Sequence, residues 1–327
     1  MDNLLNIKNL TVDLMTSRGI VYALDGVDLE VRSGEIHGLV GESGCGKSIT
    51  SKTIMRLLDR KRARVGGSIH FKGTDLLQLS EGRMQHLRGK EISMIFQEPM
   101  TSLSPLKTIG AQLGGAIANH TKLSKEERQK LVLSLLERVG LLPVEKRAEQ
   151  YPFELSGGMQ QRVMIAQAIA CSPMLVIADE PTTALDVTIQ AQILSLLKDL
   201  QQEYSMSVLL VTHNFGVVSQ ICDRVSVMYA GKIIETGETK ELLSAPMHPY
   251  TKALIECIPR GGSREKRLTA LAGSPPQLYS RTESCPFLPR CKYADALCDS
   301  RPPLRSFKDH TVLCHHAQNG VDLKGGI

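Results

Sequence analysis

The sequence has no uninterrupted apolar run of the roughly 18–20 residues that a membrane-spanning helix needs. Its first ten residues show no basic stretch followed by an apolar core, which is the pattern of a secretory signal peptide. Internal repeats and low-complexity tracts are absent as well. We therefore expect a chain that crosses no membrane by itself and stays in the cytoplasm, where thiols are kept reduced.

The sequence also has little excess of charge. Lysine and arginine number 39 against 34 acidic residues, which gives a formal net charge of +5. This balance suits a phosphate-bearing ligand or an anionic membrane surface, and it is too weak to indicate nucleic acid. Hydrophobic residues at 42% and charged residues at 22% exclude disorder, collagen and coiled coil. A length of 327 residues suggests two domains, or one domain with an appendage.

The order of the expected elements indicates an α/β fold. Up to about residue 244, short β-rich runs alternate with helical spacing, which is typical of a sheet covered by helices. Nine of the fifteen prolines lie from Pro246 onward, so we expect no long helix or central strand there. We expect strands at residues 4–14, 21–31, 35–40, 174–178 and 207–212, helices at 124–140 and 188–204, and a hairpin at 225–236.

A phosphate-binding loop of the pattern G-x-x-x-x-G-K-[ST] follows the third expected strand. Its glycines let backbone N–H groups converge on phosphate oxygens, and the next helix N-terminus adds partial positive charge. Lys47 would bridge the terminal phosphates, and the Ser48 hydroxyl would hold Mg²⁺. Cys45 lies at a helix N-terminus, which lowers a thiol pKa, although a small filler residue is the alternative. The expected nucleotide-binding residues are Gly41, Glu42, Ser43, Gly44, Cys45, Gly46, Lys47 and Ser48.

Two acidic residues end the buried strand at residues 174–178. Ligands bind at the C-terminal ends of strands in open α/β sheets, so Asp179 would reach Mg²⁺ through water and Glu180 would polarise the attacking water. A buried acidic pair is costly without a cation, which a metal-nucleotide site supplies. The two motifs together predict nucleotide hydrolysis, but they fit kinases, GTPases and many ATPases.

A third motif narrows the choice. In Leu-Ser-Gly-Gly-Met-Gln-Gln-Arg at residues 155–162, Ser156, Gly157 and Gly158 open another helix, which makes a second phosphate-recognition device. One phosphate group should not need two such devices. We therefore expect this segment to bind the terminal phosphate of an ATP held by a different subunit. An ordinary serine cap with glycines would be the alternative for the motif alone.

In their order along residues 1–244, these motifs resemble the ATP-binding cassette (ABC) family of transporter ATPases. The resemblance implies a P-loop NTPase (RecA-like) core with an antiparallel β subdomain and a helical subdomain at about 98–170 that carries the signature. It implies that Gln97 contacts Mg²⁺ and the attacking water, that Asp186 lies across the dimer interface, and that His213 holds the γ-phosphate. It also implies that ATP closes a dimer of two cassettes.

Two positions depart from the family pattern. Asn214 follows the histidine where the family usually has aspartate. The family stacks an aromatic residue on adenine between its first strands, where this chain has Leu14. The nearest aromatic is Tyr22, which we take as the candidate adenine contact, with a core role as the alternative.

Three further segments resemble the oligopeptide/dipeptide importer ATPases: Phe-Gln-Glu-Pro-Met-Thr-Ser-Leu at 96–103, Glu-Pro-Thr-Thr-Ala-Leu-Asp-Val-Thr at 180–188 and His-Pro-Tyr-Thr at 248–251. That group pairs two related ATPases with two membrane permease subunits and an external solute-binding protein. It handles peptides chiefly, and some members take nickel chelates or glutathione. We expect an ATP-hydrolysing importer subunit, one of a heterodimer, on the cytoplasmic face of the membrane. A soluble ABC ATPase or an iron- or redox-sensing regulator is the alternative.

The last 43 residues hold four of the eight cysteines. Their separations match neither common zinc sites nor small ferredoxins, so the spacing alone is weak evidence. A small, proline-broken segment nevertheless needs a staple, and the family resemblance implies a [4Fe–4S] cluster. Zinc, with His315 and His316 as substitute ligands, and unligated thiols are the alternatives. The expected ligands are Cys285, Cys291, Cys298 and Cys314, in a Cys/Pro-rich C-terminal extension at 246–327 that follows an ATPase domain at 1–245.

Overall fold

A computed structural model describes residues 3–183, 185–257, 271, 273–276 and 278–317. The chain forms two compact units, each assembled from separate stretches of sequence. Unit 1 comprises Met1–Leu4, Val31–Ile36 and Asp75–Val211, and unit 2 comprises Leu5–Glu30, His37–Thr74 and Thr212–Ile327. The expected boundary at residue 245 falls inside unit 2 and stays a prediction.

Unit 1 contains three parallel strands. They are β6 (Ile92–Ile95), β7 (Leu175–Asp179) and β8 (Ser207–Thr212), with β7 in the middle. Every residue of β7 and β8 is buried, which explains why both strands are mostly apolar runs rather than alternating patterns. β7 and β8 were expected from the sequence, whereas β6 was not.

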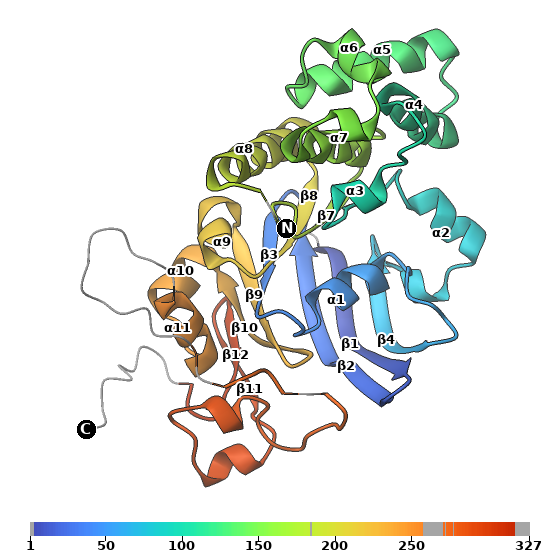
Figure 1. The fold of residues 1–327 in the computed structure, drawn as a ribbon. Coiled ribbons are helices and arrows are strands. Elements are labelled where there is room, and N and C mark those ends of the chain that lie inside the picture. The colour runs from blue at the N-terminus through green and yellow to red at the C-terminus, as the bar shows by residue number, and fades with distance from the viewer. Residues whose placement is uncertain (1–2, 184, 258–270, 272, 277, 318–327) are drawn as a thin grey trace. The chain divides into compact units, whose positions relative to one another are not determined.

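Helices make up most of unit 1. Within the group, α4, α5 and α6 pack against one another, and α4 and α5 also contact α7 (Figure 1). The predicted helix at 124–140 is confirmed as α5. Ser124 and Glu127 form a capping box at its start, with hydrogen bonds of 2.7 and 3.2 Å. The helices are η1 (Leu76–Gln78), α2 (Glu81–Leu87), α3 (Pro99–Ser102), α4 (Ile109–His120), α5 (Lys125–Arg138), α6 (Val144–Glu149), η2 (Pro152–Glu154), α7 (Gly157–Ile169) and α8 (Val187–Tyr204).

An antiparallel sheet, nearly all of it in unit 2, corresponds to the β subdomain that the resemblance implied. Its strands are β1 (Asn3–Thr16), β2 (Gly19–Arg32), β4 (Ala63–Phe71) and β5 (Thr74–Asp75), in the order β2-β1-β4-β5. β1 and β4 pair antiparallel, from Leu5 opposite Phe71 to Leu14 opposite Ala63. The strands expected at 4–14 and 21–31 are confirmed as parts of β1 and β2.

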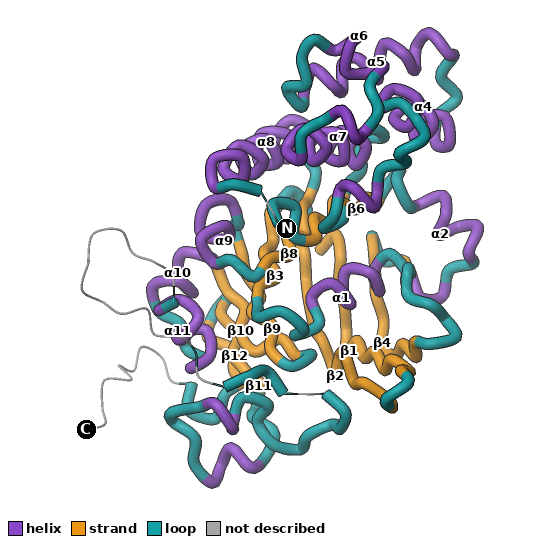
Figure 2. The backbone as a smooth tube through the Cα atoms, in the orientation of Figure 1, coloured by secondary structure: helices purple, strands orange, loops and turns teal. Residues whose placement is uncertain are grey.

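A second set of paired strands in unit 2 joins a strand near the start of the chain to strands of its C-terminal third (Figure 2). β3 (Ile36–Val40) pairs in parallel with β9 (Arg224–Tyr229), which forms the expected hairpin with β10 (Lys232–Glu238). β12 (His310–Leu313) then lies between β10 and β11 (Leu304–Phe307). The expectation that no internal strand occurs after residue 245 is therefore wrong. Residues 304–313 contain no proline, so they form a hairpin that extends the ladder.

Unit 2 also contains an aromatic core. Tyr229 of β9, Tyr250 of α11 and Phe287 are almost fully buried, and their ring centroids lie 4.6–5.4 Å apart. The segment that carries the cysteines therefore shares a core with β9 and α11. The other elements are α1 (Lys47–Ile54), α9 (Phe215–Ile221), α10 (Thr239–Ser244), α11 (Pro249–Glu256), η3 (Leu288–Arg290) and η4 (Ala296–Asp299).

Among the residues that the structure describes, none of the helices combines the length and the apolar character needed to span a bilayer.

Candidate nucleotide-binding site

The phosphate loop lies in unit 2 between β3 and α1, and its shape depends on glycine. Gly44 and Gly46 have φ values of +81° and +115°, in the left-handed region that favours glycine. A Cβ at Gly41 would lie 2.2 Å from the carbonyl oxygen of Met228, so no larger residue fits. The loop is thus held against β9, and Gly46 is the N-cap residue of α1.

Lys47 is folded back over the loop. Its side chain is buried, and its ammonium nitrogen donates to the carbonyl oxygens of Gly41 at 2.8 Å and Glu42 at 3.0 Å. A buried ammonium at a helix N-terminus gives the loop the charge that a phosphate group requires. Ser48 follows in the first turn of α1 and is half-buried.

Cys45 behaves differently from the expectation for a helix N-terminus. Its side chain is only 2% exposed, and burial raises the pKa of its thiol by more than the nearby Lys47 lowers it. The expectation that this environment favours the thiolate is therefore wrong, and Cys45 fits the alternative of a small packed residue.

Within unit 1, the acidic strand end and Gln97 come together. Asp179 ends β7 and is 3% exposed, and Glu180 follows it with φ +47°. The Gln97 side-chain nitrogen donates to Glu180 Oε2 at 2.9 Å. Because β6 and β7 are parallel neighbours, the residues that follow them reach the same edge.

Thr183 also belongs to this group, although the sequence analysis did not single it out as a site residue. Its hydroxyl donates to the same Glu180 oxygen at 2.9 Å. The signal was present, because a threonine three residues after an acid that follows a strand can hydrogen-bond back to it. Two donors therefore fix one oxygen of the Glu180 carboxylate.

The signature segment begins α7. The Ser156 hydroxyl accepts from the Met159 N–H at 3.4 Å, while Gln160 donates to the carbonyl oxygens of Pro152 and Leu155. Ser156 and Gly157 are exposed, and a Cβ at Gly158 would lie 2.8 Å from the Ile189 side chain. The helix therefore starts with an exposed N-terminus that suits an anion.

Asp186 and His213 occupy two other loops. Asp186, in unit 1, caps α8 by accepting from the Ile189 N–H at 2.9 Å. Ala184, in the same 180–188 segment as Asp186, lies outside the described residues. His213, in unit 2, is exposed, and Asn214 caps α9 by accepting from the Gly216 N–H at 2.8 Å.

Tyr22 on β2 is half-buried and already has a partner. The Arg281 guanidinium lies 5.0 Å from the centroid of the Tyr22 ring, and the backbone N–H of Tyr22 donates to the Leu278 carbonyl at 2.8 Å. Arg281 in turn pairs with Asp13 at 2.8 Å. Adenine stacking on Tyr22 stays a prediction, and the core role gains a specific contact.

The predicted site residues thus fall into two sets. Unit 1 joins Gln97 directly to Glu180, and it also carries Asp179, Ser156 and Asp186. The loop residues, with Tyr22 and His213, belong to unit 2. That both sets act on one nucleotide stays a prediction.

The four C-terminal cysteines gather in unit 2. Cys285 donates its backbone N–H to the Cys298 carbonyl at 2.9 Å. Burial raises the pKa of Cys285, Cys291 and Cys314, and neighbouring thiols among the four raise it further. Cys285, Cys291 and Cys298 belong to the aromatic core of unit 2, whereas Cys314 packs with Val312 and Ala317. That the four thiols serve one inorganic group stays a prediction.

The histidines near the thiols take different positions. Ligand atoms of His316, Asp295 and Cys298 all lie within 4.8 Å of one another. His316 Nε2 lies 3.7 Å from the Cys298 sulfur. His315 instead contacts the carbonyl oxygen of Ser300 at 3.1 Å. Of the two histidines considered as substitute ligands, His316 is therefore the better placed.

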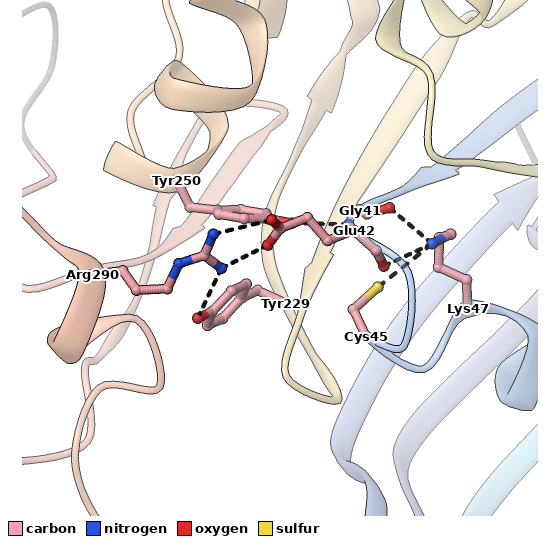
Figure 3. Close-up of polar contacts among 7 residues, drawn as sticks. All are labelled: Gly41, Glu42, Cys45, Lys47, Tyr229, Tyr250 and Arg290. Atoms are coloured by element: carbon pink, nitrogen blue, oxygen red, sulfur yellow. Dashed lines mark hydrogen bonds and ion pairs between the residues drawn. The ribbon is translucent and has the colours of Figure 1, made fainter. Parts of the chain in front are cut away.

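Two residues that the sequence analysis did not assign to the nucleotide site contact the phosphate loop (Figure 3). Arg290, next to Cys291, forms a two-point ion pair with Glu42, and the Tyr250 hydroxyl accepts from the Glu42 N–H. Nothing in their local sequence spacing points to the loop, because Arg290 lies 248 residues from Glu42.

The chain matches known families and relatives over most of its length. The family described as "ABC transporter" matches residues 24–183, and "Oligopeptide/dipeptide transporter, C-terminal region" matches residues 234–298. The dipeptide transport ATP-binding protein DppD of Bacillus subtilis is 49% identical, covering 96% of this chain and 95% of that protein. The oligopeptide transport ATP-binding protein OppD of Escherichia coli is 45% identical, covering 94% and 90%.

A solved structure agrees with the fold. The dimeric post-hydrolysis state of the ATP-binding cassette MJ0796, bound to ADP and phosphate, superposes with a TM-score of 0.65 at 31% identity. It covers 72% of this chain and 98% of that chain. With its phosphate loop, acidic strand end and signature helix, this chain therefore belongs to the ABC transporter ATP-binding family, among the oligopeptide/dipeptide transporter subunits.

Proposed function

We propose that this chain is the ATP-hydrolysing subunit of an ABC importer that takes up di- and oligopeptides through separate membrane subunits. The observation that carries the proposal is the contact of Gln97 with Glu180, which joins a candidate metal ligand to a candidate catalytic base. Relatives named for dipeptide and oligopeptide transport, matched over nine-tenths of this chain, support the peptide as solute.

Nucleotide binding would begin at the phosphate loop. Backbone N–H groups and the α1 N-terminus receive the phosphates, and Lys47 exchanges its carbonyl partners for phosphate oxygens. Ser48, Gln97 and Asp179 would hold Mg²⁺, whose preference for oxygen ligands fits a hydroxyl, an amide and a carboxylate. Bound Mg²⁺ would neutralise charge on the phosphates.

Hydrolysis would depend on Glu180. Its carboxylate, oriented by hydrogen bonds from Gln97 and Thr183, would orient the attacking water and accept its proton. His213 would donate to the γ-phosphate. Gln97 thus joins the catalytic carboxylate to the segment that follows β6.

The exposed N-terminus of α7 would complete the site of a second ATPase subunit. Ser156, Gly157 and Gly158 would bind the terminal phosphate of the partner's ATP, with Asp186 at the interface. ATP would then favour the closed dimer because it contacts both subunits only there. By resemblance to its group, the partner is a related but different ATPase.

Apolar side chains exposed on unit 1 would dock the two membrane permease subunits. Met100, Leu106 and Phe153 are 79%, 86% and 71% exposed, which is unusual for large apolar residues in one unit. The chain would then sit peripherally on the cytoplasmic face of the membrane, and the extracytoplasmic solute-binding protein would act through the permeases.

We also propose that Cys285, Cys291, Cys298 and Cys314 hold a [4Fe–4S] cluster as a structural staple of an extension at 246–327. What supports this proposal is the placement of four cysteines within 30 residues of a proline-rich segment, which needs a covalent or metal link to be stable. The alternative is zinc, for which His316 and Asp295 lie close to Cys298.

The test is transport by the assembled importer. The chain is reconstituted in proteoliposomes with its permeases and solute-binding protein, and Mg·ATP-dependent uptake of radiolabelled trialanine is measured. We expect uptake and hydrolysis, both abolished by Lys47→Met and unchanged by Lys130→Met on α5.

Competing substrates separate the alternatives. Uptake of a nickel chelate or glutathione with no uptake of trialanine would contradict peptide import. If the rate of ATP hydrolysis is the same with and without the permeases and no substrate is taken up, the result would instead favour a soluble ABC ATPase.

A further inference from the structure

Glu42, the second residue of the phosphate loop, is held at each of its polar groups (Figure 3). Its carboxylate accepts from both terminal nitrogens of Arg290, at 2.7 and 3.0 Å. Its N–H donates to the Tyr250 hydroxyl at 3.0 Å, and its carbonyl accepts from Lys47 at 3.0 Å. The peptide group between Gly41 and Glu42 is also held at both ends, because Lys47 contacts the Gly41 carbonyl.

The residues that hold Glu42 are themselves fixed. The Arg290 side chain is 4% exposed, its Nη1 donates to the Tyr229 hydroxyl at 3.4 Å, and its guanidinium lies 5.7 Å from the Tyr229 ring centroid. Tyr250 is fully buried, and burial raises the pKa of its hydroxyl, which stays neutral. Both tyrosines pack on Phe287.

The cysteine-bearing segment holds Arg290 in position. Its own N–H donates to the Phe287 carbonyl at 3.0 Å, which closes the short turn between Cys285 and Cys291. The guanidinium therefore reaches the loop from a turn bracketed by two of the four thiols. A planar guanidinium matches a carboxylate at two points, so the pair fixes orientation as well as charge.

The charge of Glu42 creates a problem for a loop that binds a polyanion. An unpaired carboxylate beside the phosphates would repel them, and the repulsion is strong because the site is partly shielded from water. Arg290 cancels that charge and keeps the carboxylate on the far side of the loop from Lys47 in Figure 3.

We propose that Arg290 is a positioning residue for the phosphate loop, through which the cysteine-bearing segment sets the affinity of the loop for nucleotide. This inference rests on the proposed function, since it requires that the loop bind ATP. Arg290 itself touches no nucleotide and acts through Glu42.

The experiment measures the Kd of the full chain for a fluorescent ATP analogue with Mg²⁺. We expect Arg290→Met to raise the Kd by about tenfold, because it leaves the Glu42 charge unpaired. Arg290→Lys keeps the charge but loses the two-point geometry, so its Kd should lie between those of the wild type and Arg290→Met. Glu42→Gln combined with Arg290→Met removes both charges and should restore most of the affinity.

A matched control is Arg301→Met, which removes another arginine of the same segment, one that pairs with Asp25 and Glu283 at 3.7 and 3.8 Å. Its Kd should equal that of the wild type. Thermal unfolding of each variant without nucleotide distinguishes a loss of folding from a loss of affinity. If Arg290→Met does not fold, the Kd values of Arg290→Lys and of the double variant still test the inference.

Two results would overturn the inference. One is an Arg290→Met protein with the wild-type Kd, and the other is a double variant as weak as Arg290→Met alone. A wild-type chain that binds no ATP analogue would instead refute the proposed function, so the two failures are distinguishable.

Discussion

The Gln97 side chain donates to Glu180 Oε2 at 2.9 Å, across the ends of two neighbouring parallel strands. Gln97 follows β6 and Glu180 follows β7, and the Thr183 hydroxyl donates to the same oxygen. Movement of the segment after β6 therefore changes the hydrogen bonding of the carboxylate. This contact would make hydrolysis sensitive to whatever binds that segment.

Replacing Glu180 tests the role of the carboxylate. Glu180→Gln keeps the size and a hydrogen-bonding oxygen but removes the base, so turnover should fall by roughly 10²- to 10⁴-fold. The Kd for ATP should stay within about twofold of the wild type, because the loop is intact. Steady-state hydrolysis by the assembled importer is the measurement, with Glu137→Gln, an exposed acid of α5, as the control. Wild-type turnover in Glu180→Gln would assign the base elsewhere.

Gly41 should tolerate no side chain. In Gly41→Ala the new Cβ would overlap the Met228 carbonyl, at 2.2 Å, so the loop must move away from β9. We expect unfolding free energy to drop by about 1–3 kcal/mol and ATP binding to weaken. Chemical denaturation and ATP titration measure both effects.

A glycine in open space provides the comparison. Gly115 lies within α4, and a Cβ added there would come within 4 Å of no atom in the described part of the chain outside its own helix turn. Gly115→Ala should therefore be neutral or stabilise by about 0.5–1 kcal/mol. Equal effects of the two substitutions would contradict the steric account of Gly41.

Acid should destabilise unit 2 through His248. Burial lowers its pKa from 6.5 to about 4, outweighing the opposite influence of Glu235. The unfolded chain therefore binds a proton below pH 6.5 that the folded chain takes up only near pH 4. The contribution of neutral His248 to the free energy of unfolding is fully present above pH 6.5. It is lost as the pH drops toward 4, by up to about 3 kcal/mol.

His248→Asn isolates this contribution. The Tyr250 N–H donates to His248 Nδ1 at 3.0 Å, and asparagine keeps an acceptor at this helix N-cap without titrating. Urea unfolding at pH 7 and pH 5 should show a smaller loss for the variant than for the wild type. Identical losses would mean that another group dominates the acid response.

Metal analysis tests the thiol cluster. Protein purified without oxygen should contain about four irons and four sulfides per chain. Cys291→Ser should lower both contents, whereas Cys171→Ser, a half-buried cysteine of unit 1, should leave them unchanged. One zinc and no sulfide would make the segment a zinc module.

Local patterns explain how far prediction from the sequence could reach. The helix at 124–140, the strands at 4–14 and 21–31 and the hairpin at 225–236 were each expected from patterns among residues a few positions apart. The phosphate loop is equally local, since its glycines and Lys47 lie within eight residues. Such features were confirmed because short-range hydrogen bonds and φ preferences act within one segment.

Pairings between residues far apart along the chain were harder to predict from the sequence. The strand β12 joins β10 although the preceding chain is rich in proline, and β6, which aligns Gln97 with Glu180, carries only four residues of weak pattern. The expectation for Cys45 was wrong because burial raises the pKa of its thiol by more than the neighbouring Lys47 lowers it. The burial of a side chain depends on the whole fold rather than on its neighbours along the chain.

The sequence by itself determined the chemistry of each segment: a phosphate loop, an acidic strand end, a signature helix and four thiols. Only the tertiary structure decided that Arg290 forms an ion pair with Glu42, 248 residues away, and that Thr183 and Gln97 both donate to one carboxylate oxygen of Glu180. The physical reason is that motif chemistry depends on neighbours along the chain. Ion pairs between distant residues depend instead on how buried aromatic side chains pack, which no spacing in the sequence encodes.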